Sequence, residues 1–246
     1  MRAASRFVAV FAALLLAASL AAASGLQVSP VSLSLQPRQN AEGLWLSNTG
    51  ENVVHAQVRV YRWTQDGGAE QLTPSRGLIV SPPMLQIAPG DRQLIRVIRP
   101  GAPAGGSGAA EEAYRVIVDE LPVDAEKRKG LQFVLRYSLP VFIEAAGSAS
   151  PQPQLRWTLR RDGERTLLEV SNNGAVHAQL AELQFVDAAG QRTEAHGGLL
   201  GYVLPGAQMR WVLKPPAAVF ASGGAFQVMI NGHMARQDVS LVDGPR

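Results

Sequence analysis

A turn motif that occurs twice constrains the fold of this chain more than any other feature of its sequence. Leu44–Gly50 (LWLSNTG) is followed by Val54–Gln57 (VHAQ), and the same arrangement returns as Leu168–Gly174 (LEVSNNG) followed by Val176–Gln179 (VHAQ). Each copy joins two short apolar segments through a Ser-Asn-Xaa-Gly turn. A Pro-Gly turn before another apolar segment then follows in both halves, so the sequence predicts two copies of one folding unit.

Short segments of alternating apolar residues, bounded by Gly, Pro, Asn and Asp, make up most of the chain. This pattern predicts strands rather than helices. Closely spaced strands with turns between them are typical of antiparallel sandwiches, so we expect an all-β fold with domains 24–146 and 147–246. The expected strands are 26–35, 43–48, 54–64, 78–80, 84–87, 92–98, 113–121, 131–143, 154–160, 165–171, 176–186, 199–203, 207–213, 225–231 and 236–242.

Residues 1–23 have the features of an export signal. Arg2 and Arg6 precede the apolar run Val8–Leu20, and three small alanines offer a cleavage site. The run is shorter than the roughly 20 residues that a membrane-spanning helix needs, so we expect cleavage and no membrane insertion. The chain contains no cysteine. An exported protein without disulfides depends on well-packed cores for its stability.

Charge and motif content argue against nucleic-acid binding and against catalysis. The 23 basic and 20 acidic residues nearly balance, whereas a nucleic-acid binder needs a concentrated basic face. His55 and His177 occupy the same position in the two repeats, which suits a repeated strand better than a catalytic pair. Asp119 and Glu120 are adjacent and so point to opposite faces of a strand. No metal-ligand spacing, nucleophile elbow or phosphate loop occurs, so we predict no enzyme activity, no metal and no cofactor.

Three segments of the first half carry a family resemblance. They are Ser81–Gly90 (SPPMLQIAPG), Tyr114–Pro122 (YRVIVDELP) and Leu131–Pro140 (LQFVLRYSLP). Together with Trp45–Gly50, they resemble the periplasmic chaperones of the chaperone–usher pilus pathway. The resemblance implies two immunoglobulin-like β-sandwich domains in an L-shaped arrangement. It also implies that the chain binds pilin subunits in the periplasm by donor-strand complementation and delivers them to an outer-membrane usher.

The strand predicted over 131–143 corresponds to the donor strand of that family. Leu131, Phe133, Leu135 and Tyr137 would plug the groove of a subunit, and Val134 would face the chaperone's own core. We therefore expect the first three to be exposed in the free protein and to cause weak self-association. The alternative is that both faces of this strand are buried between sheets or against the second domain.

The family also implies an anchor for the terminal carboxylate of the subunit, formed by an Arg and a Lys. Those positions fall near Ser32 and Pro140, which carry no cation. The candidates for a relocated anchor are Arg96, which we place first, Arg115 and Arg136, since an arginine fork suits a carboxylate. The alternative is that these arginines lie on solvated strand faces or form internal ion pairs. The sequence Arg136-Tyr137-Ser138 resembles the archaic branch of the family, which serves spore-coat-type pilins.

An interdomain ion-pair network is a further family feature that this sequence alters. Glu120 fits the acidic member, but Glu144 and Gly232 stand where an Arg and an Asp are expected. We therefore expect this network to be rewired or absent.

The alternative function is that of an exported two-domain adhesion or carbohydrate-binding module. Such a module would display aromatic side chains on loops or on a flat face. The four tryptophans fall within or at the ends of expected strands, where core packing is expected instead. They are Trp45, Trp63, Trp157 and Trp211.

Overall fold

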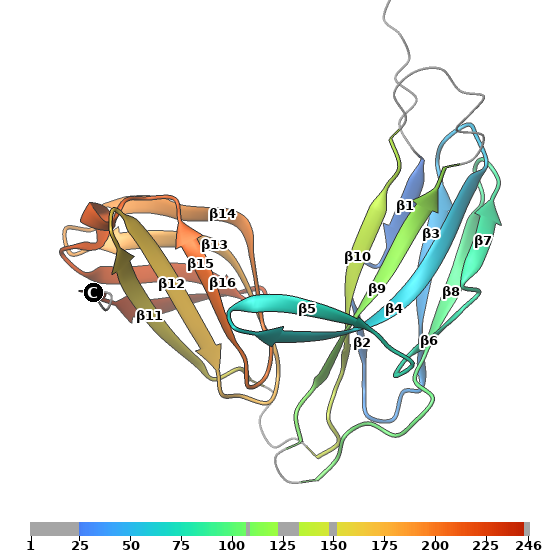
Figure 1. Ribbon diagram of the computed structural model, residues 1–246, viewed down its shortest axis with the longest axis horizontal. Coiled ribbons are helices and arrows are strands. Elements are labelled where there is room, and N and C mark those ends of the chain that lie inside the picture. Colours follow the sequence, from blue (N-terminus) through green and yellow to red (C-terminus); the bar gives the residue numbers. More distant parts are fainter. Residues whose placement is uncertain (1–24, 107–108, 123–132, 148–151, 244–246) are drawn as a thin grey trace, which may run out of the picture.

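The computed structural model describes residues 25–106, 109–122, 133–147 and 152–243. Within these residues the chain forms strands β1–β18 and one short 3₁₀ helix, η1 (Figure 1). The all-β prediction is therefore confirmed. The predicted signal peptide 1–23 and the predicted donor residue Leu131 lie outside the described residues, as do residues 148–151, which follow the predicted domain boundary at 146/147.

The first ten strands form the N-terminal unit, a sandwich of two sheets. One sheet has the order β1-β3-β8-β6; the other has the order β2-β10-β9-β4-β5, with β7 also pairing with β4. Buried leucine, valine and isoleucine side chains fill the space between them. The strands are β1 (Leu26–Ser29), β2 (Leu33–Leu35), β3 (Ala41–Asn48), β4 (Val54–Asp66), β5 (Ala69–Pro74), β6 (Ile79–Ser81), β7 (Met84–Ile87), β8 (Arg92–Ile98), β9 (Glu112–Leu121) and β10 (Arg136–Ile143).

The remaining strands form the C-terminal unit, a second sandwich with sheet orders β15-β12-β11-β18 and β14-β13-β16-β17. Three phenylalanines, Phe185, Phe220 and Phe226, lie at the centre of its core. No helix of the described residues has the length and apolarity to cross a membrane. The elements are β11 (Leu155–Asp162), β12 (Arg165–Asn172), β13 (Ala178–Asp187), β14 (Arg192–Val203), β15 (Gln208–Leu213), η1 (Ala217–Phe220), β16 (Gly224–Ile230), β17 (His233–Val239) and β18 (Leu241–Asp243).

The repeated turn motif has one structural explanation in both units. Asn48 and Asn172 are fully buried, and each side-chain amide donates to the carbonyl four residues later at 2.7 Å. Each amide also donates to a carbonyl on the opposite side of the sandwich, at 2.9 and 3.1 Å. Each side-chain oxygen accepts the N–H two residues later, at 3.0 and 2.9 Å. A buried amide needs such partners, so the motif marks the same corner of each sandwich.

The strand prediction differs from the structure in both units. In the C-terminal unit, β14 begins at Arg192 rather than at 199, and the expected strand 236–242 is divided between β17 and β18, which lie in different sheets. The expected strand 26–35 is divided, because β1 pairs with β3 in one sheet and β2 pairs with β10 in the other. The expected strand 131–143 begins only at Arg136. Strand β5 was not predicted, because all its side chains are exposed and it lacks apolar alternation. It forms a hairpin with β4 through Gly67 and Gly68, both at positive φ.

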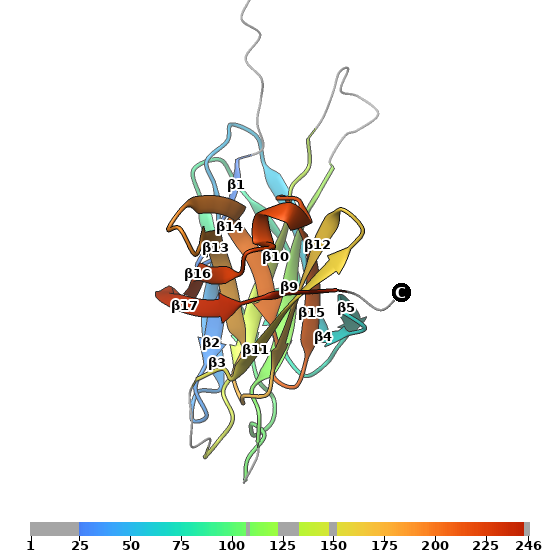
Figure 2. The same cartoon turned by 90° about the vertical axis from the view of Figure 1, so that its left-hand side faces the viewer.

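A small apolar cluster joins the two units, whose sandwiches meet at an angle in the expected L-shaped outline (Figure 1). Figure 2 shows the C-terminal unit in front of the N-terminal unit. Beside this cluster, the Gln65 side chain bonds to the backbone of the C-terminal unit at two points. It donates to the carbonyl of Tyr202 and accepts the N–H of Leu204, both at 2.8 Å. The buried members of the cluster are Trp63, Ala113, Phe142, Tyr202 and Leu204.

Candidate functional site

One edge of β10 is only partly covered by its neighbours. On one side β9 pairs with the whole strand, but on the other side β2 pairs only with Val141–Ile143. Among the described residues, no strand therefore lies beside Arg136–Pro140 on that side. An uncovered edge presents unpaired backbone N–H and C=O groups and can accept a strand from another chain.

The backbone of β10 is oriented for such pairing. The backbone N–H and C=O groups of Leu135 point toward β9. The carbonyl accepts the N–H of Glu120 at 2.9 Å, and the N–H donates to the Glu120 carboxylate at 3.0 Å. Backbone groups alternate in direction along a strand, so Arg136 and Ser138 turn theirs toward the open edge. Pro140 offers only a carbonyl there, and proline is compatible with an edge strand.

The predicted donor side chains lie in two different environments. Phe133 is 67% exposed, as expected for a residue that plugs a partner's groove. Leu135 and Tyr137 instead pack against the core of the N-terminal unit, and the Tyr137 hydroxyl donates to the carbonyl of Leu26 at 2.6 Å. Val134 is 51% exposed. The predicted exposure of Leu135 and burial of Val134 are therefore wrong.

The error comes from extending the strand alternation to residues before Arg136, where β10 begins. Odd-numbered residues from Leu139 onward face the N-terminal core, and that direction continues back through Tyr137 to Leu135. Regular pairing with β9 begins only at Arg136, so Phe133 and Val134 do not follow the alternation and are both exposed. We call Phe133–Ser138 the free segment and Leu139–Ile143 the anchored segment.

The anchored segment matches the alternative in which both faces of the strand are buried. Phe142 points away from the N-terminal core and stacks in parallel on the ring of His177, with centroids 3.6 Å apart. The His177 Nδ1 lies 2.7 Å from the Glu111 carboxylate, which links the two units. Glu111, and not Glu120, is thus the acidic residue between the units, and Glu120 bonds to Leu135 within the N-terminal unit. His177 entered the sequence prediction only as the repeat counterpart of His55, so its contact with the N-terminal unit was not predicted.

The three anchor candidates do not lie together. Arg96 is exposed in β8, which belongs to the sheet opposite β10. Its placement near the donor strand was wrong, because the sequence does not show which sheet a strand joins. Arg115 lies in β9 directly opposite Pro140, and Arg136 lies in β10 opposite Asp119.

Arg115 is a largely buried cation close to the contact between the units. Its side chain is 12% exposed, and the guanidinium lies 3.7 Å from the centre of the Trp63 ring. One terminal nitrogen is 3.5 Å from the Glu70 carboxylate, and another lies 3.4 Å from the Ser138 carbonyl. Burial lowers the pKa of Arg115, although Glu70 opposes this effect. A cation with such incomplete compensation favours an anionic partner.

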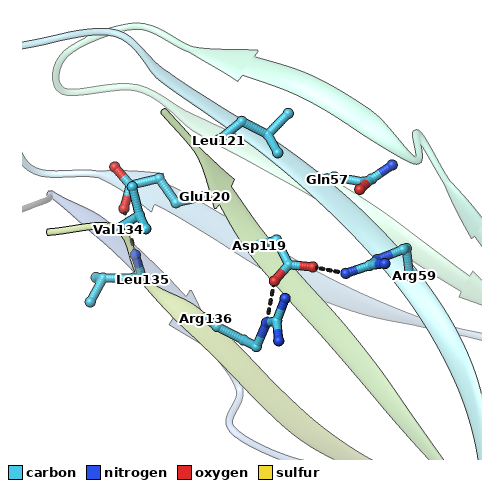
Figure 3. Close-up of a pocket in the computed structure, with 8 residues that line it drawn as sticks. All are labelled: Gln57, Arg59, Asp119, Glu120, Leu121, Val134, Leu135 and Arg136. Atoms are coloured by element: carbon cyan, nitrogen blue, oxygen red, sulfur yellow. Dashed lines mark hydrogen bonds and ion pairs between the residues drawn. The ribbon is translucent and has the colours of Figure 1, made fainter. Parts of the chain in front are cut away.

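Arg136 takes part in a cluster on the outer face of the sheet (Figure 3). Asp119 accepts hydrogen bonds from Arg59 Nη2, at 2.5 Å, and from Arg136 Nε. Burial acts to raise the pKa of Asp119, but the bonds from the two arginines outweigh it and lower that pKa. The cluster borders a cavity of about 390 Å³ lined by Gln57, Arg59, Asp119, Glu120, Leu121, Val134, Leu135 and Arg136.

The tryptophans only partly follow the prediction of core packing. Trp63 is fully buried between the units, and Trp157 and Trp211 pack against the core of the C-terminal unit. Trp45 is 37% exposed on the outer face of β3, where the Arg92 guanidinium lies 4.5 Å from the centre of its ring. The prediction is therefore wrong for Trp45. In the described part of the chain, no group of three or more His, Asp or Glu side chains could hold a metal ion.

Residues 25–148 match a family model described as pili and flagellar-assembly chaperone, PapD N-terminal domain. No curated protein sequence matches the chain significantly.

Solved structures of pilus chaperones share the whole two-unit fold. A chain of the CsuC–CsuE chaperone–tip adhesion subunit complex, from archaic chaperone–usher Csu pili of Acinetobacter baumannii, is 24% identical with a TM-score of 0.68. The match covers 88% of this chain and 99% of that one. The E. coli chaperone DraB is 17% identical, with a TM-score of 0.59 and coverages of 89% and 97%. A chain of the Salmonella enterica complex of SafA pilin with SafB chaperone is 17% identical, with a TM-score of 0.59 and coverages of 87% and 95%. These likenesses show the two-domain immunoglobulin-like fold.

Proposed function

This chain belongs to the pili and flagellar-assembly chaperone family, and from that membership we propose that it binds pilin subunits by donor-strand complementation. The free segment would add a strand to an incomplete subunit, and the loaded chaperone would then deliver that subunit to an outer-membrane usher. The observation that carries the proposal is the open edge of β10 between Arg136 and Pro140, with exposed Phe133 at its end. Backbone hydrogen bonds along such an edge supply affinity, and alternate side chains supply specificity.

The free segment offers a subunit both backbone and apolar contacts. Leu131, Phe133, Leu135 and Tyr137 are the proposed donor side chains. Phe133 would enter the groove from solvent, whereas Leu135 and Tyr137, which already face the N-terminal core, would join that core to the core of the subunit. Burying Phe133 could contribute roughly 1.5–3 kcal/mol, from which the cost of ordering and association must be subtracted.

We propose Arg115 as the anchor for the terminal carboxylate of the subunit. It lies opposite Pro140, at the boundary between the free and anchored segments, and its charge is incompletely compensated. Arg136 already bonds to Asp119, and Arg96 lies on the other sheet. A carboxylate at Arg115 would fix one end of the added strand next to the contact between the two units.

Handover to an usher requires a surface that a bound subunit leaves uncovered. The sheet β1-β3-β8-β6 lies on the opposite side of the N-terminal unit from β10. Its outer face carries the half-exposed Trp45 and the exposed Arg96. We propose that this face contacts the usher, and that the chain acts in the periplasm after removal of 1–23 as the domains 24–146 and 147–246. We also propose that it serves the archaic branch of the pathway.

Co-purification from the periplasm tests this function. The tagged full chain is expected to carry one small pilin-type subunit in equimolar amount, and Phe133→Ala is expected to reduce that amount. Without a subunit, the chain is expected to self-associate weakly through the free segment, which light scattering would detect at high concentration. Binding to a glycan resin with no subunit in any preparation would instead indicate the adhesion module.

A further inference from the structure

We propose that Arg136 recognises an acidic side chain in the strand that a subunit adds along β10, and that Asp119 positions the guanidinium for this contact. The proposal rests on the proposed function and deepens it, because it assigns part of the register selection to a named residue. It is distinct from the terminal carboxylate, whose proposed anchor is Arg115.

Arg136 is suited to this role by its place in the sequence and along the edge. It is the only charged residue between Phe133 and Ile143. It lies in the free segment, and its backbone groups turn toward the open edge. A strand added there would place one residue directly beside Arg136 on the same face of the sheet. An oppositely charged pair at such adjacent positions stabilises a sheet.

The guanidinium is held in a fixed orientation with one side unused. Its Nε donates to Asp119, and its two terminal nitrogens make no hydrogen bond or ion pair within the described residues. The side chain is 67% exposed, and Figure 3 shows one terminal nitrogen beside the bond to Asp119 and the other pointing away from it. Two terminal nitrogens can bind a carboxylate through parallel hydrogen bonds while Nε keeps its bond to Asp119.

Asp119 can position Arg136 because it is itself firmly held. Its side chain is only 11% exposed, and Arg59 binds its second oxygen at 2.5 Å. Arg59, Arg136 and Asp119 together carry a net positive charge, and the carboxylate of Glu120, which also lines the adjoining cavity, accepts the N–H of Leu135. The adjoining cavity of about 390 Å³ leaves space beside the cluster for part of another side chain. The cluster therefore favours an acidic neighbour over a basic one.

A charged contact at this place would help to select the register of the added strand. A slip of one residue moves every side chain of a strand to the opposite face. An acidic residue that pairs with Arg136 in the correct register would then point away from it. A slip of two residues would place it beside Val134 or Ser138, neither of which carries a charge. Only one register both places the acidic residue of the added strand beside Arg136 and buries the apolar side chains of that strand.

The test uses the subunit that co-purifies with the full chain, after its identification by mass spectrometry. Arg136→Gln is expected to weaken its binding about two- to fivefold, which is the range for a cross-strand charge pair. Arg136→Glu is expected to weaken binding further, and a Lys in place of one acidic residue of the subunit is expected to restore it. The difference between wild type and Arg136→Gln should shrink in high salt.

The matched control is Arg156→Gln, which removes an exposed strand arginine of the C-terminal unit. Equal binding by Arg136→Gln, Arg156→Gln and wild type would overturn the inference, as would failure of every charge reversal in the subunit. Phe133→Ala separates the two levels of the argument. If it loses the subunit while Arg136→Gln keeps it, only this inference fails. If both variants keep it, the proposed function fails.

The positioning role of Asp119 has its own measurement. In the free protein, the Nε–H signal of Arg136 is expected to be protected from solvent exchange, and Asp119→Asn should remove that protection. Asp119→Asn should also weaken subunit binding, with no added loss in the double variant with Arg136→Gln, because Asp119 acts through Arg136. Additive losses, or unchanged protection in Asp119→Asn, would show that Asp119 does not position this arginine.

Discussion

The free and anchored segments are continuous in sequence, yet they differ in almost every structural respect. In the anchored segment, Val141 and Ile143 lie in the N-terminal core, and Phe142 packs against the C-terminal unit. The free segment has one open edge, and Phe133 and Val134 are mostly exposed. Both segments are rich in apolar residues, so composition does not cause the difference. Coverage by β2 and by the second unit does.

A few polar contacts attach the free segment, besides its backbone pairing with β9 and the packing of Leu135 and Tyr137 on the N-terminal core. Tyr137 bonds to the carbonyl of Leu26, Leu135 bonds to Glu120, and Arg136 bonds to Asp119. These contacts orient the segment without covering its open edge. Truncations should therefore cost much stability in the anchored segment and little in the free segment, and the predictions below test that order.

Phe142→Ala is expected to have the largest effect. It removes a buried ring that stacks on His177 and lies within 6.0 Å of the Trp63 and Tyr202 ring centroids. Truncation of a buried phenylalanine costs about 3–5 kcal/mol of unfolding free energy. Because this ring joins the two units, small-angle scattering should also show a wider range of angles between them. A denaturant midpoint equal to that of wild type would contradict the comparison.

Tyr137→Phe is expected to have a moderate effect. It retains the ring against the N-terminal core and removes only the hydroxyl that bonds to Leu26 at 2.6 Å. Loss of one such hydrogen bond costs about 0.5–1.5 kcal/mol. Chemical denaturation would measure it, and hydrogen exchange at 135–138 should become faster. A cost as large as that of Phe142→Ala would show that the free segment is part of the folded core.

Acidification should weaken the contact between Arg136 and Asp119. The folded-state pKa of Asp119 lies below its ordinary value because the arginines bind the carboxylate more strongly than burial disfavours it. The contribution to stability is therefore present above the ordinary aspartate pKa, about 3.9, and is lost as the pH falls through the folded-state pKa. Both arginines are well exposed, so we expect under about 1 kcal/mol. Melting temperatures of wild type and Asp119→Asn should differ at pH 7 and converge as the pH falls through the folded-state pKa of Asp119.

Features set by local sequence could be predicted, and features set by distant neighbours could not. The Ser-Asn-Xaa-Gly turns gave the two units because Asn48 and Asn172 make equivalent local bonds. The direction of Leu135 depends on where pairing with β9 begins, and the sheet of Arg96 depends on the order of strands. The link from Glu111 to the C-terminal unit joins residues far apart in the chain. The direction of the Leu135 side chain, the sheet that contains Arg96 and the link from Glu111 therefore have no signature within a single segment of the sequence.

Phe133→Ala is expected to have the smallest effect on stability and a clear effect on subunit binding. The side chain is 67% exposed in the free protein, so its truncation removes little buried surface. Substitutions at such positions change the unfolding free energy by about 0.5 kcal/mol or less. In a complex the same ring would be buried in the groove of the subunit, so its loss should weaken binding about tenfold or more. Val134→Ala is the matched control, because Val134 is the adjacent exposed apolar residue and is not among the proposed donor side chains. Melting curves and subunit titrations on both variants would separate stability from binding.

If Phe133→Ala lowered the melting temperature as strongly as Phe142→Ala, the result would contradict the exposed position of the Phe133 side chain in the free protein. If Val134→Ala weakened binding and Phe133→Ala did not, the subunit would take its side chain from the other face.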